Sequence, residues 1–134
     1  ELATWRFVQI ENFSSEELDQ TLNESLIFLA FSHMEGFGLP PAEAMAAGCI
    51  VIGYTGVGGD EYFTTRYGCP IQDCDMVSFI STVRTIVAEY EKNPAQLDET
   101  RQKAARYIHT EYNAQKHKTE LLKIWAGIDG GADA

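Results

Sequence analysis

The chain has 134 residues, which is enough for one ordinary domain but too few for a complete two-domain enzyme. Hydrophobic residues make up 45% and charged residues 22% of it, and this globular composition excludes a disordered or low-complexity protein. The formal net charge of −10 argues against nucleic-acid binding, because nucleic-acid binders present a basic patch. The chain begins at Glu1 without an initiator Met, so we expect it to be a piece of a longer protein.

The first part of the chain alternates between strand and helix patterns. Residues 4–10 (TWRFVQI) are rich in aromatic and β-branched side chains, which predicts a short strand. Ser14 followed by Glu17 is a capping box, so we expect a helix that runs to about Asn23. Residues 26–31 (LIFLAF) form a continuous apolar run, which is typical of a strand buried on both faces of a parallel sheet.

Another helix and two strands follow. Pro40 and Pro41 suit the first turn of a helix, where backbone N–H groups have no intrahelical partner, and Gly48 suits its end. Residues 49–54 (CIVIGY) predict a second buried strand, and residues 69–72 predict a last short one.

The second half of the chain is predicted to be helical. Apolar residues recur at three- and four-residue spacing from Met76 to Tyr90, and we expect the face that they form to be core. Asn93 and Pro94 should end this helix and cap the next one. Apolar positions between residues 121 and 128 mark a final helix.

This order of elements predicts an α/β fold with a doubly wound parallel sheet. Ligands bind such folds at the carboxyl ends of the strands. That rule indicates the loop after Phe31 and the loop after Tyr54, both of which are rich in glycine. We therefore expect the functional site at these two loops.

The loop after Phe31 opens a helix and carries carboxylates. Its glycines let the backbone approach a ligand closely, and free N–H groups at the start of a helix suit a phosphate. Glu35 lies on the loop, and Glu43 is expected in the first turn of the helix, so both can accept hydrogen bonds from hydroxyl groups. A nucleotide with an attached sugar offers both phosphate and hydroxyl groups.

The segment EGFGLPPAEAMAAG, residues 35–48, resembles the E-x7-E motif of retaining glycosyltransferases of family 4. The flanking segments agree: LIFLAFS, a strand ending in serine, precedes it, and CIVIGYTGVGGDE, a strand and glycine turn ending in acidic residues, follows it. In that family the motif lies in the C-terminal, Rossmann-like half of the GT-B fold. The resemblance implies a three-layer α/β/α arrangement with a parallel sheet, and a truncated C-terminal domain over residues 1–129 with a flexible tail at residues 130–134.

The resemblance also implies roles for individual residues. Glu35 would be the catalytic residue, beside the donor sugar near the reacting carbon, and Glu43 would accept the ribose hydroxyls. Backbone amides that contact the sugar and the diphosphate would come from Gly36, Phe37, Gly38 and Leu39. Thr55 and Gly56, with Glu61, would complete the site from the second loop, which has more glycine than the common form.

By the same resemblance, the full-length parent would transfer a glycosyl group with retained configuration from a UDP-, GDP- or ADP-linked sugar, without a metal or other cofactor. An N-terminal domain absent from this chain would bind the acceptor. The Arg and Lys that contact the diphosphate in the family have no counterpart here, since Arg6 stands alone on a predicted strand. We expect the chain to be inactive alone, and its parent to be cytoplasmic or peripheral to a membrane through the missing domain.

Two other functions stay open at this point. One is a nucleotide-binding or protein-interaction module that keeps the fold without the chemistry. The other is a related GT-B enzyme such as a phosphorylase or synthase of storage polysaccharide. An unpaired edge strand at residues 4–10 and an exposed apolar face also predict a homodimer, which light scattering would test.

Other kinds of site are less well supported. The dinucleotide-binding fingerprint fails because Pro41 stands where its third glycine would be, and the second glycine turn lacks the GK[ST] of a P-loop. A zinc site is not expected, because His33, His109 and His117 lack the companions that such sites need. The cysteines are odd in number and form no CxxC pair, which argues against a disulfide framework, and Cys49 is predicted to be a core residue.

Overall fold

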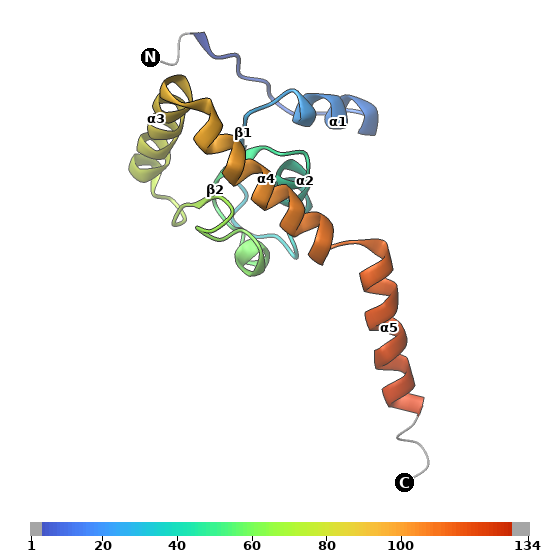
Figure 1. Ribbon diagram of the computed structural model, residues 1–134. Helices are drawn as coiled ribbons and strands as arrows, with labels where there is room; N and C mark the ends of the chain where they lie inside the picture. The colour runs from blue at the N-terminus through green and yellow to red at the C-terminus, as the bar shows by residue number, and fades with distance from the viewer. Residues whose placement is uncertain (1–3, 130–134) are drawn as a thin grey trace.

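The computed structural model describes residues 4–129, and the predicted tail at residues 130–134 lies outside them. The elements in chain order are α1 (Ser15–Asn23), β1 (Ile27–Ala30), α2 (Leu39–Ala46), β2 (Ile50–Gly53), the 3-10 helix η2 (Gly58–Glu61), β3 (Cys69–Pro70), α3 (Met76–Lys92), α4 (Pro94–Glu111) and α5 (Ala114–Asp129). Figure 1 shows the first eight gathered into one body, from which α5 projects.

The three strands form one parallel sheet in the order β1-β2-β3. Phe28 pairs with Val51 in the middle of the first ladder, and every residue of the central strand β2 is buried. This burial on both faces explains the continuous apolar run of β2, and β1, which is partly buried, has a similar run. β3 is only two residues long, and its Pro70 has no N–H to donate to a ladder. The α/β fold with a parallel sheet is confirmed.

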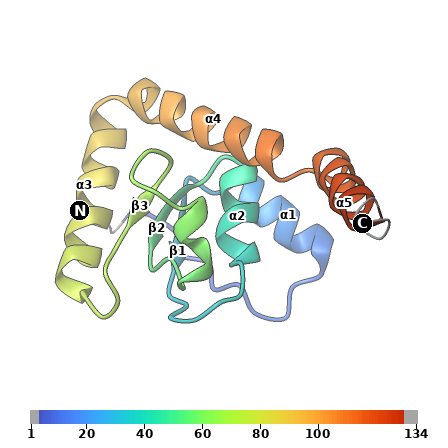
Figure 2. The same cartoon turned by 90° about the horizontal axis from the view of Figure 1, so that it is seen from below.

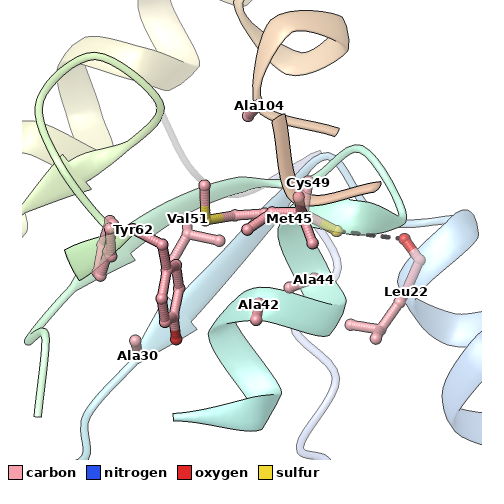
Figure 3. Close-up of a cluster of buried hydrophobic side chains, with 11 residues drawn as sticks. Leu22, Ala30, Ala42, Ala44, Met45, Cys49, Val51, Tyr62 and Ala104 are labelled. Atoms are coloured by element: carbon pink, nitrogen blue, oxygen red, sulfur yellow. Dashed lines mark hydrogen bonds between the residues drawn. The ribbon is translucent and has the colours of Figure 1, made fainter. Parts of the chain in front are cut away.

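Helices cover both faces of the sheet. Val51 of β2 faces a cluster that contains Leu22 of α1, Met45 of α2 and Ala104 of α4 (Figure 3). Ile50 and Ile52, which point the other way because side chains alternate along a strand, pack in a second cluster with α3. Figure 2 shows the strands between α3 on one side and α2 on the other, with α4 running across both. The three-layer α/β/α arrangement is therefore confirmed.

The predicted helix ends are mostly correct. The capping box is complete: the Ser14 N–H donates to Glu17 Oε2 at 2.8 Å, and the Glu17 N–H donates to Ser14 Oγ at 3.2 Å. These hydrogen bonds hold the pKa of Glu17 below its usual value. Asn93 is the N-cap of α4, but its side chain makes no capping hydrogen bond.

The strand predicted at residues 4–10 is wrong. Residues 5–10 are irregular and mostly exposed, with Phe7 65% accessible. Residues of this segment, of β1 and of α3 line a groove of about 960 Å³. The segment therefore lies near β1 but is separated from it by the groove and does not pair with it as a strand. A residue composition typical of strands does not make a strand when no neighbouring backbone lies within pairing distance. β1 and β3 are the two edges of the sheet. The homodimer, which was predicted from an edge strand at residues 4–10 and an exposed apolar face, stays a prediction that no longer has that strand to support it.

Two amphipathic helices are less buried than their patterns predicted. On α3, Phe79, Val83, Ile86 and Val87 are buried, but Met76 and Ile80 are each 48% exposed, so the apolar stripe is core only in part. The apolar residues of α5 are all exposed: Leu121, Leu122, Ile124, Trp125 and Ile128. Within residues 4–129, no helix has the length and apolar character needed to cross a bilayer.

Cys49 and Cys74 are expected to react with thiol reagents at very different rates. Cys49 is fully buried, its Sγ lies 3.2 Å from the Leu22 carbonyl oxygen (Figure 3), and burial raises the pKa of its thiol to about 11. Cys74 is exposed. Because only the thiolate attacks, brief alkylation at about pH 8 should label Cys74 in the native chain and Cys49 only in urea, as read by mass spectrometry. Equal labelling of both in the native chain would contradict the core placement of Cys49.

Candidate functional site

The loops that follow β1 and β2 meet at the carboxyl edge of the sheet. The parallel register brings the ends of β1 and β2 side by side, with Ala30 opposite Gly53. Beyond the strands, the Glu35 N–H donates to the Gly56 carbonyl oxygen at 2.8 Å, and Glu35 forms an isolated parallel bridge with Val57. The two loops that the sequence analysis selected therefore form one continuous surface.

Glycine in the second loop allows this close approach. A Cβ placed on Gly58 would lie 2.3 Å from the Gly36 carbonyl oxygen, so a side chain there would separate the two loops. Val57 turns the chain with φ 68° and ψ −56°, and the Gly58 N–H donates back to the Gly56 carbonyl oxygen at 2.8 Å. This is a tight three-residue turn of the rare, strained kind. The glycine content of this loop thus has a structural cause.

Glu35 is half-buried and held from two sides. Its N–H is bonded to the second loop, and the Ser32 hydroxyl donates to its Oε1 at 2.5 Å. Its carboxylate therefore has a restricted orientation and keeps free acceptor capacity, because an ionised carboxylate offers about four lone-pair sites. The sequence pattern predicts Ser32 only as the end of a strand and misses its contact with Glu35. The Ser-x-x-Glu spacing is the local signal that indicates this contact.

The start of α2 leaves a short run of backbone amides free. Gly38 is the N-cap, and Leu39 is the first helical residue. The next two positions are Pro40 and Pro41, which have no N–H. Within residues 4–129, we find no acceptor for the backbone N–H groups of Gly36, Phe37, Gly38 and Leu39. Gly36 and Leu39 are exposed, whereas Gly38 is buried, so the exposed donors together with the positive end of the helix dipole suit an anion.

Glu43 lies farther along α2 than predicted. The helix begins at Leu39, so Glu43 is its fifth residue and belongs to the second turn, and the first turn holds no acidic residue. Its side chain is exposed. Residues four apart share a helix face, so Glu43 lies one turn beyond Leu39, whose side chain is also exposed. The placement in the first turn was wrong, but Glu43 still lies on the same exposed face as the side chain of Leu39, one turn from the start of the helix.

Phe37 has its side chain directed into the protein. Its ring centroid lies 5.0 Å from that of Tyr62 and 5.2 Å from that of Tyr112. Tyr112 in turn donates a hydrogen bond to Glu61 at 2.9 Å. The ring of Phe37 is therefore partly buried against other aromatic rings, and the side chain of Glu61 is engaged with the end of α4.

The other predicted residues of the second loop contribute through their backbone. The Thr55 carbonyl oxygen accepts the Gly59 N–H at 2.9 Å, which starts η2. Gly56 is buried and binds the Glu35 amide as described. The structure therefore brings Thr55 and Gly56 to the same edge as Glu35, in a supporting position behind it.

His33 lies beside this site without a metal-binding cluster. Its ring stacks on Tyr54 with centroids 5.0 Å apart, and its Nδ1 lies 3.4 Å from Asp73, an ion pair only when the histidine is protonated. Among residues 4–129, no group of three histidine, cysteine, aspartate or glutamate side chains could hold a metal ion. The side chain of Arg6 is remote, because it lines the groove beside β1.

Comparison with known proteins places the chain in a family. A relative of the chain is the alpha-1,6-glucosyltransferase of Actinobacillus pleuropneumoniae serotype 7 (strain AP76), which is 26% identical over 125 residues. The alignment covers 91% of this chain but only 37% of that protein, so the chain spans little more than a third of its relative's length. No solved structure matches the chain. The family model of glycosyl transferases group 1 matches residues 5–107, which include both loops and all the strands but not α5. The chain belongs to the family of glycosyl transferases group 1.

Proposed function

We propose that the protein that carries this chain transfers a glycosyl group from a nucleotide sugar to an acceptor with retention of configuration, and that this chain provides the donor side. Family membership supports a transferase that uses a nucleotide-sugar donor. The name of the 26% identical relative, a glucosyltransferase, favours a hexosyl donor. The observation that carries the proposal is the fixed carboxylate of Glu35 beside the free amides of Gly36 to Leu39.

In this proposal, the amides hold the diphosphate and the carboxylates hold the sugars. The N–H groups of residues 36–39 and the dipole of α2 stabilise the negative charge of the diphosphate. Glu43, one turn farther along the exposed face of α2, accepts hydrogen bonds from the ribose hydroxyls. Glu35 accepts them from the donor sugar, and Thr55 and Gly56 support it from behind.

The chemical step breaks the bond between the anomeric carbon and the diphosphate oxygen. The electron pair of that bond leaves with the diphosphate, where the amides stabilise it, while positive charge develops on the sugar ring. The carboxylate of Glu35 stabilises this oxocarbenium-like character. The acceptor hydroxyl then forms the new bond to the same carbon and passes its proton to the departing diphosphate.

Other parts of the parent are needed for turnover. We propose that a separate domain binds the acceptor. We also propose that basic side chains outside this chain help to neutralise the negative charge of the diphosphate, and that the reaction needs no cofactor besides the donor. The chain alone would then show no measurable transfer. We further propose a cytoplasmic protein, with peripheral membrane attachment through the other domain as the alternative.

Titration of the parent with UDP-, GDP- and ADP-linked hexoses tests the proposal. One of these donors should bind, and Glu43→Ala should weaken its binding by about tenfold, because the ribose hydroxyls lose a charged acceptor. Isothermal titration calorimetry measures both affinities. Glu16→Ala is the matched control, since Glu16 is an exposed glutamate in the first turn of α1 and belongs to neither of the two loops.

Three results would contradict parts of this proposal. No binding of any nucleotide sugar would overturn it. Binding without transfer to any sugar acceptor would favour the non-catalytic module instead. Robust transfer by the 134-residue chain alone would overturn the claim that it needs a second domain.

A further inference from the structure

The hydroxyl of Tyr62 connects the second loop to the start of α2. Tyr62 directly follows η2, and its side chain is fully buried (Figure 3). Its Oη donates a hydrogen bond to the Gly38 carbonyl oxygen, and a Cβ built on Gly38 would lie 2.8 Å from that Oη. Burial raises the pKa of Tyr62 to about 12, so the hydroxyl keeps its proton at neutral pH and remains a donor.

Gly38 has few other constraints on its carbonyl group. It is the N-cap of α2 in the left-handed conformation, with φ 83° and ψ 61°, and it has no side chain that could cap the helix. The Ala42 N–H reaches its carbonyl oxygen at 3.4 Å, which is long for a hydrogen bond. Tyr62 therefore supplies the better of the two contacts to this carbonyl.

The Gly38 carbonyl and the Leu39 N–H belong to one peptide unit. A peptide unit is planar and trans, so its C=O and N–H point in opposite directions. The Tyr62 hydroxyl holds the C=O toward the buried cluster, and the Leu39 N–H must then point away from that cluster. This N–H is the one free amide of the first turn of α2, because the next two residues are prolines.

We propose that Tyr62 is a positioning residue of the donor site, which holds the Gly38 carbonyl inside the fold and thereby aims the Leu39 N–H at the diphosphate. This inference rests on the proposed function and adds a residue from outside the E-x7-E segment. The ring of Tyr62 also helps to position this peptide, because it packs on the ring of Phe37, the residue before Gly38, with the ring centroids 5.0 Å apart.

Tyr62→Phe in the full-length parent tests this role, because it removes the hydroxyl and keeps the ring. Tyr67→Phe is the matched control, since the Tyr67 ring stacks on Tyr107 with centroids 4.2 Å apart and makes no contact with Gly38. The first measurement needs no ligand. Amide hydrogen exchange of Ala42 should be at least about fivefold faster in Tyr62→Phe, because the Ala42 N–H loses the hydroxyl oxygen beside it and the Gly38 carbonyl can rotate away from it. It should be unchanged in Tyr67→Phe.

The second measurement compares each nucleoside diphosphate with its nucleoside. UDP, GDP and ADP are titrated, with uridine, guanosine and adenosine beside them. Tyr62→Phe should weaken binding of the preferred diphosphate by about tenfold, the effect of losing one well-aimed hydrogen bond to a charged group, and leave nucleoside binding unchanged. If the role of Tyr62 is purely structural, Tyr62→Phe should instead have a lower melting temperature and bind the diphosphate and the nucleoside more weakly by the same factor. That result would overturn the proposal.

The two measurements separate the possible failures. Unchanged exchange of Ala42 in Tyr62→Phe would show that the hydroxyl does not hold the peptide, whatever the ligand does. Faster exchange with an unchanged diphosphate affinity would overturn the role in binding alone. If the unmodified parent binds none of the three diphosphates, the proposed function fails and the role of Tyr62 toward a diphosphate fails with it.

Discussion

Gly53→Ala should destabilise the chain by about 4 kcal/mol or more, a large fraction of the stability of an ordinary domain. Gly53 is the last residue of β2, where φ is 142°, a conformation that residues with a Cβ rarely adopt. A Cβ there would lie 2.0 Å from the Ala30 carbonyl oxygen in β1, the same oxygen that accepts the Tyr54 N–H at 2.9 Å. Relief of this overlap requires the two strands to separate at the site edge. Urea unfolding followed by circular dichroism measures the loss.

The control for this prediction is Gly127→Ala. Gly127 lies within α5, and a Cβ there would meet nothing within 4 Å. Alanine is the better helix former by up to about 1 kcal/mol, so this variant should be no less stable than the original chain. If Gly53→Ala unfolds at the same urea concentration as Gly127→Ala, the close approach of β1 and β2 at Gly53 is incorrect.

Glu35→Gln should lower the turnover of the parent by about a hundredfold to a thousandfold, with the donor still bound. Glutamine keeps the size of the side chain and an acceptor for the Ser32 hydroxyl, but it removes the negative charge that stabilises the developing positive charge on the sugar. The loss should therefore appear in kcat more than in KM. Initial rates of transfer from the donor identified by titration provide the measurement.

Glu16→Gln makes the same chemical change at an exposed position in the first turn of α1 and should leave kcat unchanged. Equal turnover for Glu35→Gln and the unmodified parent would remove Glu35 from the mechanism. A lower melting temperature for Glu35→Gln would instead show that part of the lower turnover comes from weakened hydrogen bonds of Glu35 with Ser32 and the second loop.

The central part of the fold was predictable from local sequence patterns. β2 is buried on both faces and β1 is at least partly buried along its length, and each appears in the sequence as an uninterrupted apolar run. The capping box of α1 and the glycine after α2 act within a few residues, and both were recognised. The site loops followed from the rule that parallel sheets bind ligands at the carboxyl ends of their strands.

The predictions that failed depend on distant parts of the chain. Residues 4–10 have the composition of a strand, but composition does not show whether a partner backbone lies beside them. The apolar stripe of α3 is longer than the surface that covers it, so Met76 and Ile80 stay half-exposed. Tyr62 was not identified, because its contact with Gly38 spans 24 residues and no local pattern indicates it.

The turn assigned to Glu43 failed for a different reason. The proline pair correctly indicated the first turn of a helix, but the helix already begins at Leu39, directly after a left-handed glycine. This earlier start moves every later residue along the helix, so Glu43 falls in the second turn. Resolving that difference requires the backbone conformation of Gly38, which both glycine's freedom and the contact with Tyr62 determine.

The aromatic contacts of Phe37 have a consequence for how this loop can diverge. Its ring packs against Tyr62 and Tyr112, while its backbone N–H has no acceptor within residues 4–129. The side chain at position 37 must therefore fit between the rings of Tyr62 and Tyr112. The backbone N–H and C=O of this residue are the same whichever side chain meets that requirement. The side chains of this loop and of the end of α4, where Tyr112 lies, can therefore change together during evolution while the backbone of the loop keeps its conformation.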